Sequence, residues 1–155
     1  TVLVQSGTLS KWDIVLAVHL KGTFNTIRAA SVHMREAKGG RFINMSSVSA
    51  QRGGGVFGKV PYSSAKAAIL GFTKALAREV AHTGVTVNAV TPGAVDTNIR
   101  VGSTDEQEAK LAADIPVGRT SSTEEVAAVI TFLSSPDASY LTGTTVDING
   151  GSHIH

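Results

Sequence analysis

A tyrosine, a lysine and an upstream serine have the residue types and spacing of a proton-transfer site. Tyr62 and Lys66 are four residues apart, so on a helix their side chains lie on the same face, one above the other. A phenol is a weak base near neutral pH, but a nearby ammonium group stabilises the phenolate. Such a pair can exchange a proton with an alcohol or carbonyl oxygen, which the hydroxyl of Ser47 can orient. Because tyrosine and lysine also meet at this spacing by chance on amphipathic helices, the surrounding sequence must decide.

The surrounding motifs favour the chemical interpretation. Asn-Met-Ser-Ser at residues 44–47 follows a short apolar run, and Tyr62 comes 15 residues after Ser47. Asn-Ala-Val-Thr-Pro-Gly at residues 88–93 follows later, and the chain ends in Val-Asp-Ile-Asn-Gly-Gly at residues 146–151. In this order the motifs resemble the classical short-chain dehydrogenase/reductase family along essentially the whole chain.

The alternation of apolar patterns predicts an α/β fold. Helical spacing runs from a capping box at Ser10 to the glycines at residues 39–40, and further helices are expected over residues 61–83, 105–113 and 122–133. Strands are expected over residues 41–46, 85–90 and 144–148. We therefore expect a largely parallel sheet with helices on both faces, which places Ser47 at the carboxyl edge, where ligands bind in such sheets. The glycine-rich residues 51–60 lack the following helix of a phosphate loop and predict a flexible loop on the substrate side.

Composition excludes several other classes. Hydrophobic residues make up 42% and charged residues 17% of 155, which indicates one folded domain spanning residues 1–155. The formal charge of +2 is too small to indicate a nucleic-acid partner, and the absence of cysteine excludes disulfides and thiol chemistry. No apolar run reaches the ~18 residues of a membrane span, and no signal peptide is visible. The default expectation is a cytoplasmic protein without nucleic-acid or membrane partners.

The resemblance implies a role for each site residue. Tyr62 would be the general acid/base, Lys66 would favour its phenolate and hold the nicotinamide ribose, and Ser47 would position the substrate oxygen. Ser46 is the less expected serine, because the family pattern uses the second of the pair. The turn at Pro92 and Gly93 would line the nicotinamide of NAD or NADP, and its carboxamide would meet the backbone of Val95 and the hydroxyl of Thr97.

One departure from the family pattern lies in Val-His-Leu-Lys-Gly at residues 18–22. His19 stands where the resemblance implies a fourth catalytic residue, an asparagine that maintains a helix kink and a water-mediated link from the lysine to solvent. Histidine donates, accepts and changes charge near neutral pH, so His19 is expected to keep this relay. The alternative is a histidine that only packs within an apolar helix.

A second departure concerns the missing opening of the family fold. The glycine-rich turn that holds the dinucleotide phosphates is absent, so the chain resembles the C-terminal three-fifths of a Rossmann-like, doubly wound domain, and the choice between NAD and NADP stays open. His153 and His155 are too few to indicate a metal site, and a frayed polar tail is expected there.

These features predict an oxidoreductase that interconverts a secondary alcohol and a ketone. The substrate is expected to be a small molecule of the 3-oxoacyl, sugar, polyol or steroid type. By resemblance the protein forms a homo-oligomer, a dimer or tetramer, through the helices expected over residues 10–38 and 61–83. A truncated, non-catalytic relative is the main alternative. An epimerase or dehydratase using the same pair is disfavoured by the serine spacing and by the end of the chain at Gly150 and Gly151.

Overall fold

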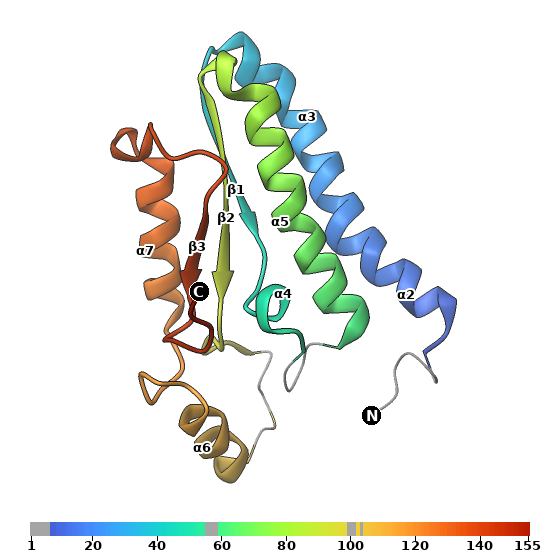
Figure 1. The fold of residues 1–155 in the computed structure, drawn as a ribbon, viewed down its shortest axis with the longest axis vertical. Coiled ribbons are helices and arrows are strands. Elements are labelled where there is room, and N and C mark those ends of the chain that lie inside the picture. The colour runs from blue at the N-terminus through green and yellow to red at the C-terminus, as the bar shows by residue number, and fades with distance from the viewer. Residues whose placement is uncertain (1–6, 55–58, 99–101, 103) are drawn as a thin grey trace.

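In the described part of the chain, three parallel strands form the sheet around which the helices pack. The structure, a computed structural model, describes residues 7–54, 59–98, 102 and 104–155. The strands are β1 (Gly40–Met45), β2 (Val85–Pro92) and β3 (Thr145–Ile148), in the order β1-β2-β3. Asn44 pairs with Ala89, which in turn pairs with Thr145 across the sheet. The predicted parallel α/β arrangement is confirmed (Figure 1).

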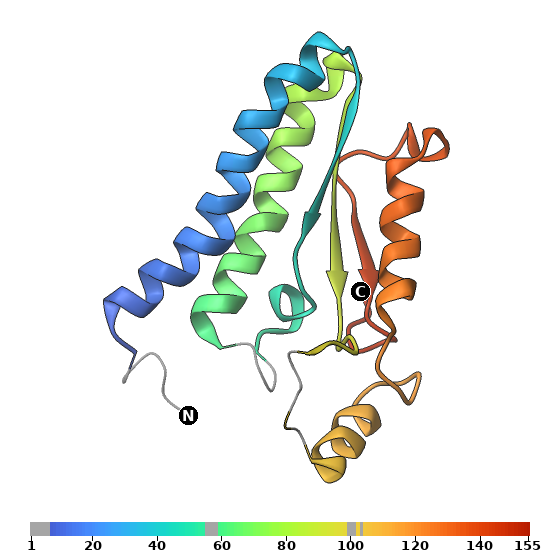
Figure 2. The same cartoon turned by 180° about the vertical axis from the view of Figure 1, so that it is seen from behind.

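Helices cover both faces of this sheet, as predicted. Two long helices, α3 and α5, lie on one face and α7 lies on the other, whereas α6 lies beyond the carboxyl edge (Figures 1 and 2). Within the described residues, no helix combines the length and the apolar character needed to cross a membrane. The helical segments are α2 (Leu9–Leu16), the π-helical η1 (Ala17–Lys21), α3 (Gly22–Glu36), α4 (Ser49–Arg52), α5 (Val60–Val80), the 3₁₀ turn η2 (Ala81–Thr83), α6 (Asp105–Ala113), α7 (Thr123–Ser134) and the 3₁₀ turn η4 (Pro136–Ala138).

The hydrophobic core has two layers because successive strand side chains point to opposite faces. Phe42 of β1 packs with Ile27 of α3 and Ala77 of α5. The next residue, Ile43, packs in the other layer with Leu133 of α7. The first seven residues of β2 are all buried, as expected for a central parallel strand covered on both sides.

The first helix begins two residues earlier than the sequence predicts. The N-cap is Thr8, whose hydroxyl accepts from the backbone N–H of Lys11, and Ser10 lies inside α2. Thr8 and Ser10 both carry the hydroxyl that such a cap needs, so the sequence could not separate them. The capping box at Ser122 is confirmed, with Glu125 accepting from the Ser122 backbone N–H.

The glycine-rich stretch after β1 contains a helical turn where the sequence predicts a loop. Residues 49–52 form α4, and the Ser49 hydroxyl donates to the Gly54 carbonyl. The Gly54 N–H in turn donates to the Ser63 hydroxyl of α5 at 2.9 Å. These contacts attach the start of the predicted loop to α5. The rest of its glycine-rich core, residues 55–58, lies outside the described residues.

Candidate functional site

Two hydrogen bonds attach α5 to the carboxyl end of β1. The buried Ser46 hydroxyl donates to the backbone carbonyl of Lys66 at 2.8 Å. The Lys66 ammonium donates to the Met45 carbonyl at 2.8 Å. The Ser46 hydroxyl is therefore used in a structural hydrogen bond between the end of β1 and α5. Ser47, which is only half-buried, follows it at the edge of the sheet, and its preference over Ser46 as the functional serine stays a prediction.

Lys66 is a buried cation. Only 7% of the residue is exposed, and the loss of hydration lowers the pKa of its ammonium group from the ordinary value. An ammonium has three N–H donors, of which the Met45 carbonyl takes one. The helix thus presents a partly desolvated positive charge with donor capacity left for other groups.

Tyr62 lies next to both Lys66 and His19. The Lys66 Nζ is 5.7 Å from the centre of the Tyr62 ring. The centres of the His19 and Tyr62 rings are 5.2 Å apart, and the rings meet edge to face at 85°. Three of the four predicted catalytic residues are therefore brought together by one turn of α5 and the facing turn of η1.

His19 lies in a helical turn of unusual geometry. The sequence predicts one continuous helix from Ser10 to the glycines at residues 39–40, but the structure divides it into α2, η1 and α3, and η1 is π-helical. The carbonyl of His19 accepts from the Thr23 hydroxyl at 2.7 Å. Such π turns insert an extra residue, which re-aims side chains, and they are frequent at functional sites. The irregularity places the His19 ring against Tyr62.

The environment of His19 favours its neutral form. Burial lowers the pKa of the imidazole, and the positive charge of Lys66 lowers it further. Because the ring carries one donor and one acceptor nitrogen when neutral, it can both give and take a hydrogen bond next to the Tyr62 ring. This is the capacity that a proton relay requires.

Ser47 begins the turn that follows β1. Its hydroxyl oxygen accepts from the Ser49 N–H at 3.1 Å, which leaves the hydroxyl hydrogen to be directed elsewhere. The next residue, Val48, donates its N–H to the Pro92 carbonyl at 3.0 Å. The predicted substrate-side serine and the predicted nicotinamide-side turn are thus joined through the backbone.

The turn after β2 approaches β3 closely at Gly93. Its N–H donates to the Ile148 carbonyl at 2.9 Å, and a Cβ there would lie only 3.0 Å from the Asn149 Cα. Beyond it, Val95 forms a parallel bridge with Ser121. Pro92 and Gly93 lie at the same edge as Ser47, whereas Val95 and the exposed Thr97 lie on the segment that leads toward α6.

Sequence reasoning did not identify Asp147 at this edge. Its carboxylate accepts from the Gln51 amide of α4 at 2.7 Å and from the Thr91 hydroxyl of β2. The signal was present, because Asp147 is the one charged residue in the strand expected over residues 144–148. The expected frayed tail is also corrected, since His155 Nε2 lies 3.1 Å from Asp147 Oδ2.

Comparison with known proteins identifies relatives along most of the chain. A family model described as enoyl-(acyl carrier protein) reductase matches residues 3–153. The chain is 43% identical over 148 residues to an uncharacterized short-chain type dehydrogenase/reductase of Sinorhizobium fredii. It is 39% identical over 144 residues to a 3-oxoacyl-[acyl-carrier-protein] reductase of Vibrio cholerae and 42% identical over 144 residues to an acetoacetyl-CoA reductase of Allochromatium vinosum. Each match covers 93% of this chain but only 57% or 58% of the relative.

Solved structures show the same relationship. The crystal structure of a 3-oxoacyl-[acyl-carrier protein] reductase from Brucella melitensis superposes with a TM-score of 0.93 at 38% identity, covering 98% of this chain and 56% of that one. The TT0495 protein of Thermus thermophilus superposes with a TM-score of 0.88 at 38% identity, covering 94% of this chain and 62% of that one. The described sheet and helices are therefore part of a Rossmann-like fold. The chain belongs to the short-chain dehydrogenase/reductase family.

Proposed function

We propose that the full-length protein reduces a ketone to a secondary alcohol with NADH or NADPH, and that the ketone is a 3-oxoacyl thioester. The observation that carries the proposal is the Tyr62 ring next to both His19 and the buried Lys66. The substrate class is supported by relatives named as 3-oxoacyl-[acyl-carrier-protein] and acetoacetyl-CoA reductases. Because the chain spans under two thirds of those relatives, the proposal concerns a polypeptide that also carries a nucleotide-binding segment.

The proton is the part of the reaction that this chain handles. Tyr62 donates its phenolic proton to the carbonyl oxygen as the carbonyl carbon is reduced, and the charge of Lys66 stabilises the resulting phenolate. Ser47 donates a hydrogen bond to the same oxygen and fixes its position. His19 then links the phenolate and the lysine to solvent for reprotonation. In the reverse direction each residue performs the opposite transfer.

The residues after β2 fit the nicotinamide end of a dinucleotide, which supplies the hydride when bound. In the bridge between Val95 and Ser121, the bonds are made by the Ala94 carbonyl and the Asp96 N–H. In a parallel bridge of this kind, the N–H and carbonyl of the central residue, Val95, point to the opposite side. The backbone of Val95 therefore offers one donor and one acceptor on the same side of the strand, which is what a carboxamide requires. The remaining N–H donors of Lys66 suit the ribose hydroxyls.

The Tyr62→Phe variant tests the proposal. Phenylalanine keeps the ring against His19 and removes only the ionisable hydroxyl, so turnover of acetoacetyl-CoA should fall by roughly 10²–10⁴-fold, the usual contribution of general acid–base catalysis. Tyr140→Phe is the matched control, since Tyr140 is fully exposed. The readout is the loss of reduced-nicotinamide absorbance with NADH and NADPH in turn. Turnover by Tyr62→Phe within a few-fold of the parent would refute the assignment.

Two alternatives are separated by the same assay. If the full-length protein binds a reduced dinucleotide but turns over no ketone, a non-catalytic relative is indicated. The family model's description names enoyl reduction, so crotonyl-CoA is included as an unsaturated substrate without a 3-oxo group. Faster turnover of crotonyl-CoA than of acetoacetyl-CoA would replace the ketone in the proposal with a carbon–carbon double bond.

A further inference from the structure

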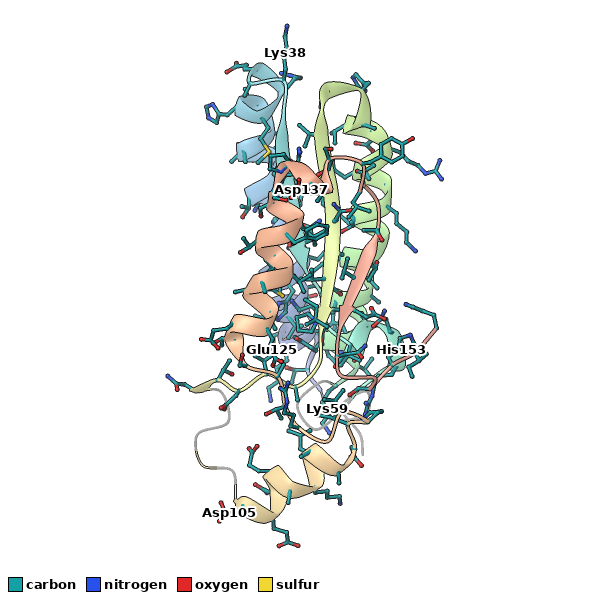
Figure 3. The ribbon with its side chains drawn as sticks, turned by 90° about the vertical axis from the view of Figure 1, so that its left-hand side faces the viewer. Lys38, Lys59, Asp105, Glu125, Asp137 and His153 are labelled. Carbon is teal, nitrogen blue, oxygen red and sulfur yellow. The ribbon has the colours of Figure 1, made fainter. Side chains whose placement is uncertain are left out.

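Asp147 and the two histidines of the C-terminal tail form a cluster with the chemistry of a metal site. One ligand atom from each of Asp147, His153 and His155 lies within 4.8 Å of the others. The two imidazole rings are 4.8 Å apart between centres, at 88° to each other. His153 lies beside the carboxyl end of β3 (Figure 3). None of the three residues has a role in the proposed proton transfer.

The chain returns to Asp147 through a turn that only glycine accommodates well. Gly150 and Gly151 both have positive φ, 61° and 86°. A Cβ on Gly150 would lie 2.8 Å from Cγ2 of Ile115, so a side chain is excluded there. Asn149 holds the turn, because its Oδ1 accepts from the Gly151 N–H at 2.9 Å and its Nδ2 donates to the His153 carbonyl at 3.2 Å. The tail is thus directed back over β3.

The carboxylate of Asp147 is oriented by neighbours on two other elements. Its Oδ1 accepts from the Gln51 amide of α4 and from the Thr91 hydroxyl of β2, and its Oδ2 is left facing His155 Nε2 at 3.1 Å. Metal-binding carboxylates are commonly oriented by hydrogen bonds of this kind. Asp147 is therefore held with one free oxygen toward the histidines.

Gln51 lies beside the cluster and orients its carboxylate. Its Oε1 is buried and has no hydrogen-bond partner within the described residues, which is costly for an amide oxygen. Its Nε2 lies 3.4 Å from His155 Nε2 and donates to Asp147 Oδ1 at 2.7 Å. The amide therefore keeps its nitrogen toward the cluster and holds the carboxylate beside His155.

We propose that Asp147, His153 and His155 bind a divalent transition metal of the Zn²⁺ type. Two imidazoles and one carboxylate suit Zn²⁺ and Co²⁺, whereas Mg²⁺ and Ca²⁺ prefer all-oxygen sites. A metal at this place joins the tail to β3, and the hydrogen bond from Gln51 joins Asp147 to α4. Because α4 begins two residues after Ser47, the metal stabilises the edge of the sheet that carries the candidate site.

Metal titration of the full-length protein tests the proposal. After treatment with a chelator, Zn²⁺ is titrated by calorimetry and Co²⁺ by visible absorption, whose intensity reports tetrahedral coordination. We expect one Zn²⁺ per chain and a rise in Tm on binding. His155→Gln should weaken Zn²⁺ at least ~10-fold and abolish the tetrahedral Co²⁺ band. His82→Gln, which alters an exposed histidine of η2, is the matched control and should bind like the parent.

Asp147→Asn is a weaker test by itself because Asp147 also accepts structural hydrogen bonds. A fall in the Tm of this variant without metal would reflect the loss of those bonds. His155 is 70% exposed in its side chain, so His155→Gln should keep its metal-free Tm. Equal Zn²⁺ binding by the parent and His155→Gln, or an equal loss in His82→Gln, would overturn the proposal. It would leave His155 and Asp147 as a simple ion pair.

Discussion

Replacing Lys66 by methionine isolates the effect of one buried charge on the proposed reaction. Methionine has a similar length but no charge and no N–H donor. The Lys66 Nζ lies 5.7 Å from the centre of the Tyr62 ring. With an effective dielectric constant of about 20, a unit negative charge on that ring is stabilised by ~3 kcal/mol. This corresponds to about 100-fold in rate, so we expect Lys66→Met to lower kcat for acetoacetyl-CoA by about that factor in the full-length protein.

Lys66→Met should change the stability of the fold less than it changes the rate of the reaction. Burial lowers the pKa of Lys66, so the folded state bears a cost for holding the charged form at neutral pH, and methionine removes that cost. Against this, the Met45 carbonyl loses its donor, at a cost of ~1–3 kcal/mol if it stays unpaired. The two effects have opposite signs. A shift in Tm of only a few degrees is expected.

The assay compares Lys66→Met with Lys74→Met at saturating cofactor. Lys74 is an exposed lysine two turns later on the same helix, so its variant has the same change in net charge. Steady-state kcat, KM for the nicotinamide cofactor, and Tm are measured for each. Turnover by Lys66→Met within threefold of Lys74→Met, with both variants folded, would show that the charge does not act on Tyr62.

Four further predictions concern substitution of His19, the pH dependence of stability, the helical surface and the isolated chain. His19→Asn should keep most of the turnover and His19→Leu should lose it at unchanged Tm; equal activity in the two would indicate that His19 only packs. The folded state lowers the pKa of His19, so the unfolded chain binds a proton there more readily. The stability of the parent relative to His19→Asn should therefore fall as the pH drops from 6.5 through the lowered pKa. Equal dependence of Tm on pH in the two proteins would contradict this. Ile14 and Val18 are more than 60% exposed on α2 and η1, so we expect the full-length protein to form a homo-oligomer, which a monomeric mass in light scattering would disprove. The 155-residue chain alone should not bind NADH or NADPH tightly in calorimetry, because the phosphates lack a glycine-rich turn; micromolar binding by a soluble monomer would refute this.

Elements with strong periodicity or clear caps could be predicted from the sequence. Residues 105–113 form α6 as expected, because Thr104 and Gln107 make a capping box that local sequence alone specifies. By contrast, α4 has only four residues, too few for a periodic pattern, and is held by contacts of Ser47, Ser49 and Gly54. The π turn of η1 escaped prediction for a related reason, since one extra residue in a turn barely changes a helical apolar pattern.

The residue types of the candidate site could be predicted, but several of its contacts could not. The spacing of Tyr62 and Lys66 places them on one face of a helix from local geometry alone. The bond from Lys66 to the Met45 carbonyl is different, because its acceptor is backbone and carries no signature of residue type. The contact between Gln51 and Asp147 joins residues 96 positions apart, so it depends on the tertiary fold.

Among the described residues β1 pairs with β2 alone, so its other edge is open there. Met45 at its end is 43% exposed, although parallel strands are normally covered on both faces. We expect the remainder of the full-length protein to pack along β1 and cover the Met45 carbonyl where Lys66 donates. Excluding water there would lower the pKa of Lys66 further and strengthen the attraction between its charge and the Tyr62 phenolate. Such covering would increase the loss of turnover expected for Lys66→Met.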